Sequence, residues 1–134
     1  GGTIGLMVLQ ACISLGATDI TVVDVIEKRL ELAKKLGAAR VINGKEEDTV
    51  AVLRSEEMYG DHGVDLVFEA AGAVFTAQQA VQIVSRGGKI MMVGTQSKPV
   101  PIDFLKINRE VTIQTSFRIA ITSADDRSDL IRKI

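Results

Sequence analysis

The residues best suited to chemistry stand at the start of the chain, directly before a helical pattern. Gly2 and Gly5 match the last two glycines of the G-x-G-x-x-G turn that binds dinucleotide phosphates. Gly1 then falls in a variable position, and the first glycine of the motif would lie before residue 1. Gly2 would let the backbone approach a pyrophosphate, while the helix N-terminus would offer it N–H donors. Alone this half-motif is weak, because glycines at a chain start are also common cloning remnants.

An acidic residue at the expected distance strengthens the motif. Asp24 ends a short β-branched run, 19 positions after Gly5 (24 minus 5). A carboxylate about 20 residues beyond the turn accepts the ribose hydroxyls of a dinucleotide, and it repels a 2′-phosphate. The pattern therefore favours NAD over NADP. Asp24 could also cap the helix that begins near Glu27, and the two roles are compatible. Arg29 could reach the ribose or adenine, or be a solvated charge.

The sequence predicts a scaffold of alternating helices and strands for these residues. Helices are predicted at residues 4–15, 27–36, 48–59 and 74–84, and strands at 20–24, 40–42, 64–69, 89–94 and 110–115. A single helical turn is predicted at 103–106, and Ser123 is expected to cap a last helix. Strands separated by helices of about ten residues indicate βαβ units with right-handed crossovers. The predicted fold class is therefore α/β, a doubly wound parallel sheet of the Rossmann type.

The first strand of such a sheet is missing from the sequence. In the usual strand order it is central and immediately precedes the glycine turn, so here it would lie before residue 1. We expect a gap in the sheet that is filled by a swapped segment, by a neighbouring chain or by a preceding part of a longer chain. Residues 1–134 are expected to form one dinucleotide-binding domain, truncated at both termini.

The composition excludes several classes of protein. The 134 residues are 46% hydrophobic and 25% charged, with a net charge of −1 and no basic block for nucleic acid or a membrane surface. No apolar run approaches the roughly 20 residues of a membrane span. Cys12 is the only cysteine and is expected in the core, so no intrachain disulfide can form. With His62 as the only histidine, a tetrahedral zinc site is implausible. A cytoplasmic location is expected.

Longer runs of the sequence resemble the medium-chain dehydrogenase/reductase family. The resembling segments are residues 2–6, 16–17, 22–24, 29–30, 33–38, 65–72 and 86–94. Residues 108–113, followed by 117–118, are similar to the polyol-dehydrogenase branch, which includes sorbitol and threonine dehydrogenases. The resemblance implies a parent enzyme, expected to be a homo-oligomer, that transfers hydride between the carbon of a small alcohol and NAD. In this family the zinc and its ligands belong mostly to a separate catalytic domain, so no catalytic or metal residue is expected in this chain.

The resemblance also implies where the cofactor would lie. The implied contacts are Gly2, Ile4 and Gly5 at the pyrophosphate, Asp24 and Arg29 at the adenosine ribose, Ala70 and Ala71 beside the adenine, Val93, Gly94 and Thr95 at the nicotinamide, and Ser116, Phe117 and Arg118 closing over it. Thr3 stands where this turn often has proline. Ile119 stands where the polyol branch commonly has an aromatic residue.

Two other functions share a glycine turn with an acidic residue. One is an S-adenosylmethionine-dependent methyltransferase, although the Gly87-Gly88 pair is not expected there. The other is a non-catalytic domain that senses nucleotides. The short-chain dehydrogenases are disfavoured, because Tyr59 is followed four positions later by Gly63 instead of lysine. Glu69 ends a strand near the expected cofactor crevice, and its carboxylate is expected to accept nearby backbone N–H groups.

Overall fold

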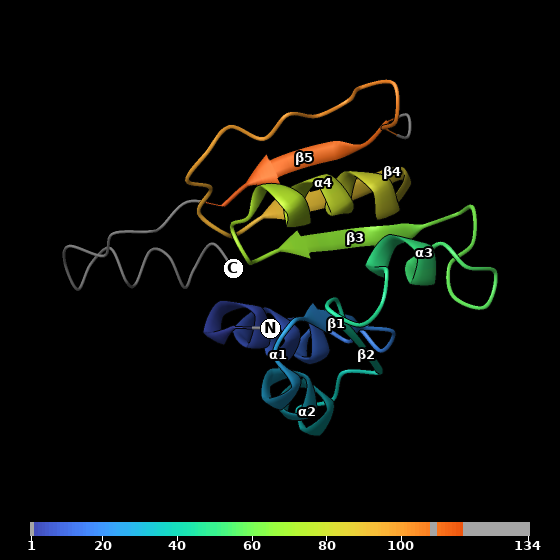
Figure 1. Cartoon of the computed structure of the whole chain (residues 1–134). Coiled ribbons are helices and arrows are strands. Elements are labelled where there is room, and N and C mark those ends of the chain that lie inside the picture. Colours follow the sequence, from blue (N-terminus) through green and yellow to red (C-terminus); the bar gives the residue numbers. More distant parts are fainter. Residues whose placement is uncertain (1, 108–109, 117–134) are drawn as a thin grey trace.

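The computed structural model describes residues 2–107 and 110–116, and these form helices around two parallel sheets (Figure 1). The elements in chain order are α1 (Thr3–Ser14), β1 (Thr21–Asp24), α2 (Glu27–Lys35), β2 (Arg40–Asn43), α3 (Thr49–Leu53), β3 (Val64–Glu69), α4 (Val74–Ile83), β4 (Val84–Met92) and β5 (Thr112–Thr115). β1 pairs with β2 in one sheet, and the other has the order β3-β4-β5. All paired strands are parallel, which confirms the predicted fold class. No helix in the described part of the chain is long and apolar enough to cross a membrane.

Two of the helices, α2 and α4, cover the sheets with their apolar faces. α2 packs on β1 and β2, while α4 packs on β3 and β4 (Figure 1). In α2, Leu30 and Ala33 are buried one turn apart, so that helix buries a single stripe of side chains. Ala80 of α4 packs with Val84 and Ile90 of β4 in a buried cluster. These clusters fix the strands whose carboxyl ends carry the candidate site.

Three predicted elements differ from the structure. α3 begins after its predicted cap, Asp48, which accepts the Val50 N–H at 3.0 Å, but it ends at Leu53 instead of near residue 59. The chain then passes through turns, where the Arg54 side chain binds the backbone carbonyls of Gly60 and Asp61. β4 begins before the Gly87-Gly88 pair, within a bulge against β3, and ends at Met92. Residues 103–106 form a hydrogen-bonded turn and no helix, and the helix expected at Ser123 lies outside the described residues.

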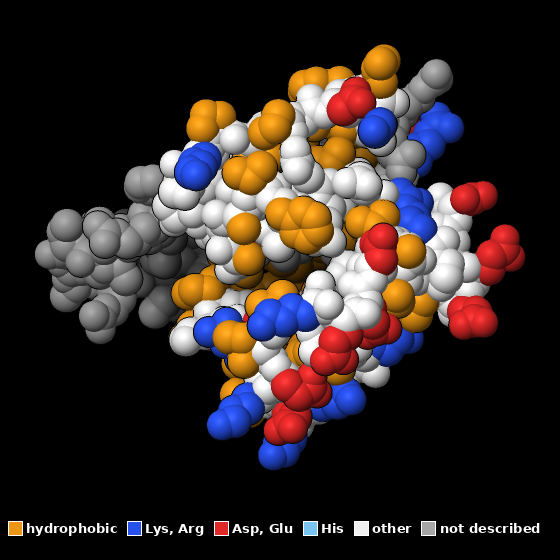
Figure 2. Space-filling model, viewed as in Figure 1, with side chains coloured by type: hydrophobic (Ala, Val, Ile, Leu, Met, Phe, Trp, Pro, Cys, Tyr) orange, Lys and Arg blue, Asp and Glu red, His pale blue; other side chains and the backbone are white. Residues whose placement is uncertain are grey.

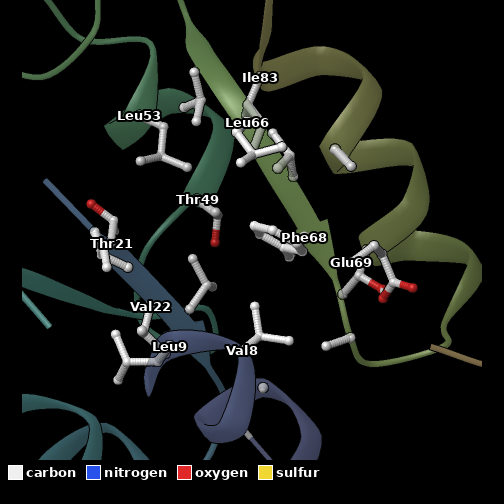
Figure 3. Close-up of a pocket in the computed structure, with 18 of the residues that line it drawn as sticks. Val8, Leu9, Thr21, Val22, Thr49, Leu53, Leu66, Phe68, Glu69 and Ile83 are labelled. Carbon is white, nitrogen blue, oxygen red and sulfur yellow. Dashed lines mark hydrogen bonds between the residues drawn. The ribbon is translucent and has the colours of Figure 1, made fainter. Parts of the chain in front are cut away.

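The sheet is divided between β1 and β3, which confirms the expected gap. Figure 2 shows the molecule hollowed between the two sheets, with hydrophobic side chains in the hollow. The cavity measures about 320 Å³ and is lined mostly by apolar side chains, among them Val22 of β1 and Leu66 and Phe68 of β3 (Figure 3). Cys12 is only half-buried and lies on this lining, so the expectation that it is a core residue was wrong.

One surface carboxylate, that of Asp65, is expected to make stability depend on pH. Asp65 Oδ1 accepts a hydrogen bond from Ser85 Oγ at 2.8 Å and lies 2.9 Å from His62 Nε2. These two partners, Ser85 foremost, lower the pKa of the Asp65 carboxyl below its ordinary value. A lowered carboxyl pKa adds stability that is present above the unfolded-state pKa and is lost as the pH falls through the folded-state value.

We therefore expect the urea midpoint to fall as the pH drops below about 5, and the Asp65→Asn variant to lose part of that dependence. The effect is expected to be small, because the Asp65 side chain is 79% exposed. Asparagine keeps an oxygen that can accept the Ser85 hydrogen bond, so the variant changes mainly the charge. Identical pH profiles for the variant and the wild type would contradict this assignment.

Candidate functional site

The first candidate feature is the uncapped N-terminus of α1. Gly2 precedes the helix, no side chain caps it, and its first turn holds no acidic residue. Its N–H groups and the positive end of the helix dipole therefore suit an anion such as a phosphate. A Cβ on Gly5 would lie 3.9 Å from Ala70 Cβ, which is an ordinary contact. α1 thus begins beside the turn that follows β3, while Ile4 is 51% exposed.

Asp24 lies next to this helix N-terminus, at the carboxyl end of β1. Its Oδ1 accepts the N–H groups of Val25 at 2.7 Å and Ile26 at 2.9 Å, and its side chain is only 6% exposed. Burial by itself would raise the pKa of this carboxyl, but the hydrogen bonds it accepts, those from Ile26 and Val25 included, lower it. These hydrogen bonds hold the carboxylate ahead of α2, but no side chain caps that helix, whose N-cap is Ile26, so the alternative role of Asp24 as its cap was wrong.

Arg29 lies between Asp24 and the glycine turn. Its Nη1 is 3.7 Å from Asp24 Oδ2, and a Cβ on Gly2 would lie 3.9 Å from the same nitrogen. The structure thus brings the predicted phosphate turn, ribose acid and arginine together at one edge. A carboxylate and a guanidinium at this edge can recognise ribose hydroxyls and a phosphate, respectively.

Glu69 organises the turn after β3, where Ala70 and Ala71 lie. Its Oε1 accepts the N–H groups of Ala71 at 2.9 Å and Gly72 at 3.0 Å, which confirms the expectation from sequence. The same oxygen accepts the Thr76 hydroxyl at 2.7 Å, from the first turn of α4. Figure 3 shows Glu69 at the end of β3 beyond Phe68. Ala70 and Ala71 line the cavity between the two sheets.

The turn after β4 crosses closely over the turn after β3. The N–H groups of Val93 and Gly94 both donate to the Glu69 carbonyl at 2.8 Å. A Cβ on Gly94 would lie 2.3 Å from the Gly72 nitrogen, so only glycine fits at this crossing. The Thr95 carbonyl faces Gly72, and Ser116 N–H donates to the Met92 carbonyl at 2.8 Å. The described nicotinamide-end residues, Val93 to Thr95 and Ser116, therefore lie at the carboxyl ends of β4 and β5, and the first of these turns packs on the turn after β3.

The structure assembles most of the predicted residues and adds several that the sequence did not single out. Phe117 and Arg118 lie outside the described residues. The additions are Gly72, Thr76 and Gln96, all of which donate hydrogen bonds to the Glu69 carboxylate. The run of small residues after β3 hinted at a close crossing, but the partners of Glu69 are 7 and 27 positions away. No local pattern in the sequence marks those distances.

The site fits a dinucleotide better than it fits a metal ion. A buried carbonyl, Gln96 Oε1, has no hydrogen-bond partner, and such orphan acceptors call for a water or a ligand. The uncapped N-terminus of α1 offers hydrogen-bond donors, while the Asp24 carboxylate and Gln96 Oε1 offer acceptors. All three lie near the carboxyl ends of the strands. Among the residues that the structure describes, no group of three or more His, Cys, Asp or Glu side chains could hold a metal ion.

Known proteins share both the sequence and this arrangement. The profile of a family described as "Zinc-binding dehydrogenase" matches residues 3–134. YdjJ of Escherichia coli K12, named a zinc-type alcohol dehydrogenase-like protein, is 60% identical over 119 residues, which are 89% of this chain and 34% of that protein. The sorbitol dehydrogenase of Bacillus subtilis is 39% identical over 124 residues, which are 90% of this chain and 34% of the enzyme. The chain thus spans about a third of the length of these relatives.

A solved structure confirms the fold. A zinc-binding dehydrogenase from Sinorhizobium meliloti, bound to NADP, superimposes with a TM-score of 0.83 at 26% identity. The match covers 99% of this chain and 40% of that one. These similarities support neither a methyltransferase nor a nucleotide-sensing domain. The chain belongs to the zinc-binding dehydrogenase family, within the medium-chain dehydrogenases, and corresponds to its dinucleotide-binding part.

Proposed function

We propose that this chain binds NAD, in preference to NADP, as the cofactor-binding part of an alcohol or polyol dehydrogenase. The observation that carries the preference is the Asp24 carboxylate. Its side chain is only 6% exposed, and two backbone N–H groups bind it beside the phosphate turn. A fixed carboxylate accepts the two ribose hydroxyls and repels a 2′-phosphate. The nearby Arg29 could attract a 2′-phosphate, but Asp24 lies 3.7 Å from it and offsets its charge.

The dinucleotide would extend along the carboxyl ends of the strands. Gly2, Ile4 and Gly5 would face its pyrophosphate, and Ala70 and Ala71 its adenine side. Val93, Gly94, Thr95 and Ser116 would surround the nicotinamide, joined by Phe117 and Arg118. When bound, the nicotinamide supplies hydride chemistry, while this chain binds and orients it.

The remaining parts of the proposal concern the whole enzyme. A small alcohol, such as a polyol, would be the substrate, and zinc with its ligands would lie outside this chain. β5 is the outer strand of its sheet, and all of its residues are exposed. An exposed edge of this kind can pair with a second copy, which supports the expectation of a homo-oligomer. A cytoplasmic location belongs to the same proposal.

The Asp24→Asn variant tests the cofactor preference. Asparagine keeps an oxygen for the Val25 and Ile26 N–H groups but loses the charge. We expect NAD to bind about tenfold more weakly and NADP more tightly, because hydrogen bonds to a charged group are worth about 1.5–3 kcal/mol and the repulsion disappears. Calorimetric titration of the natural protein with both dinucleotides measures the two dissociation constants.

The Asp48→Asn variant is the matched control. Asp48 likewise accepts two backbone N–H groups, those of Val50 and Ala51. It should leave the ratio of the two dissociation constants unchanged. An unchanged ratio in Asp24→Asn would refute the role of Asp24, and failure of the wild type to bind either dinucleotide would refute the proposed function.

A further inference from the structure

The Glu69 carboxylate is buried and held by a complete set of donors. Its side chain lies at the end of β3, and the residue is 3% exposed. Besides the three donors to Oε1, Oε2 accepts the Gly72 N–H at 3.2 Å and the Gln96 side-chain amide at 2.9 Å. Because backbone N–H groups and the NH2 of the Gln96 amide can only donate, both oxygens act as acceptors. The group is therefore an ionised carboxylate.

No cation in the described part of the chain neutralises the charge of this carboxylate. Among the described residues, no Lys, Arg or His forms an ion pair with Glu69. The cavity that Glu69 lines contains no cationic side chain either, within the same part of the chain. Dipoles solvate the carboxylate but leave its net charge of −1 in place. A buried charge in a low-dielectric surrounding acts over a longer distance than an exposed one.

The position of this charge relates it to the proposed cofactor. The Glu69 carbonyl holds the N–H groups of Val93 and Gly94, and its Oε2 would lie 2.9 Å from a Cβ on Gly94. If the proposed function holds, this turn lies at the nicotinamide end of the dinucleotide. The nicotinamide ring is cationic when oxidised and neutral once it has accepted a hydride.

We propose that Glu69 discriminates between the two redox states of the cofactor, favouring NAD⁺ over NADH through its buried negative charge. The hydrogen bonds around Glu69 position the two turns for either form, since both forms have the same shape in the adenosine half. The charge acts on the ring alone, and only when the ring is cationic. Glu69 is thus a positioning residue for the turns and an electrostatic selector of redox state.

The measured quantity is the dissociation constant of NADH divided by that of NAD⁺, obtained by calorimetry on the natural protein. A high ratio means that NAD⁺ is preferred. Damage to the fold or to the turns weakens both forms together and leaves the ratio unchanged. Loss of the charge weakens NAD⁺ selectively. We expect Glu69→Gln to lower the ratio about tenfold, the scale of two unit charges that interact over about 12 Å at an effective dielectric constant near 20.

Two variants at Gln96 complete the test. Gln96→Lys keeps the Glu69 carboxylate and its backbone partners but places an ammonium beside Oε2, so it should lower the ratio in the same direction. If circular dichroism shows that Glu69→Gln does not fold, the Gln96→Lys variant alone tests whether the charge sets the ratio. Gln96→Met removes the whole amide without changing any charge. It can weaken NAD⁺ and NADH, but it should weaken both alike, so the ratio should stay within twofold of the wild type.

The outcomes separate this inference from the proposed function. Wild-type protein that binds neither NAD⁺ nor NADH would overturn the proposed function, and this inference with it. Wild-type protein that binds both, with ratios unchanged in Glu69→Gln and Gln96→Lys, would overturn this inference alone. An equal fall in Gln96→Met would show that the lost hydrogen bond, and not the charge, sets the ratio.

Discussion

Replacing Gly94 with alanine is expected to displace the turn after β4 and to weaken dinucleotide binding on the order of 100-fold. The new Cβ would lie 2.3 Å from the Gly72 nitrogen, 2.8 Å from Gly72 Cα and 2.9 Å from Glu69 Oε2. Two of these atoms are backbone and the third belongs to a buried, fully bonded carboxylate, so no flexible side chain can move aside. We expect a loss of stability at or above the upper end of the roughly 1–3 kcal/mol typical of overpacking.

The loss of binding follows from which hydrogen bonds must stretch. The Gly94 N–H donates to the Glu69 carbonyl and the Gly72 N–H to the Glu69 carboxylate, so separating Gly94 from Gly72 disturbs both turns. Displacements of about 1 Å in a positioned site cost on the order of 100-fold in function. Urea denaturation and NAD titration of Gly94→Ala would measure the two effects.

Gly44→Ala is the matched control for this prediction. The nearest atom to its Cβ would be Thr49 Oγ1 at 3.4 Å, followed by Val23 Cγ1 at 3.7 Å. These are ordinary contacts, and Gly44 has no left-handed backbone that an alanine would strain. Its stability and NAD affinity should stay close to those of the wild type. Equal behaviour of the two alanine variants would mean that the crossing of Gly72 and Gly94 does not constrain the site.

The contrast between these glycines shows what the sequence could predict about the site. Gly2 and Gly5 were recognisable, because their spacing and the following helix form a local pattern. Asp24 was recognisable for the same reason, since it ends a strand at a fixed distance from the turn. The contact between Gly72 and Gly94 joins two turns that are 22 positions apart (94 minus 72), and only the three-dimensional structure reveals it.

Local signals in the sequence also explain which helices and strands were predicted correctly, and contacts between distant residues explain which were not. α2 was predicted within one residue, because its apolar stripe, its basic last turn and Gly37 are all local signals. The end of α3 was wrong because side-chain partners distant in sequence determine it. The gap between β1 and β3 was predicted from the strand order of the fold class, and what fills it stays a prediction.

Arg54 is the residue that ends α3, and its removal is expected to cause a large loss of stability. Its guanidinium donates to four backbone carbonyls: those of Gly60 at 3.5 Å, Asp61 at 3.0 Å, Gln82 at 3.0 Å and Val84 at 3.1 Å. One side chain thus joins the turns after α3 to the junction of α4 and β4. Gly63 is packed against it, since a Cβ there would lie 2.8 Å from Arg54 Nη1.

We expect Arg54→Met to lose about 3 kcal/mol, because hydrogen bonds to charged groups contribute roughly 1.5–3 kcal/mol each but are not additive. Part-buried carbonyls at Gly60 and Val84 would lose this donor. Urea denaturation measures the change. Arg54→Lys should recover only part of it, because an ammonium cannot reproduce the planar fork of donors that reaches four carbonyls.

Arg86→Met provides the comparison on the surface. Arg86 is 71% exposed and forms a single ion pair with Glu110 at 3.2 Å. Exposed pairs of this kind contribute about 0–1 kcal/mol, so this variant should be nearly as stable as the wild type. Equal losses in Arg54→Met and Arg86→Met would show that the guanidinium of Arg54 does not hold the turns after α3. The early end of α3 would then need another cause.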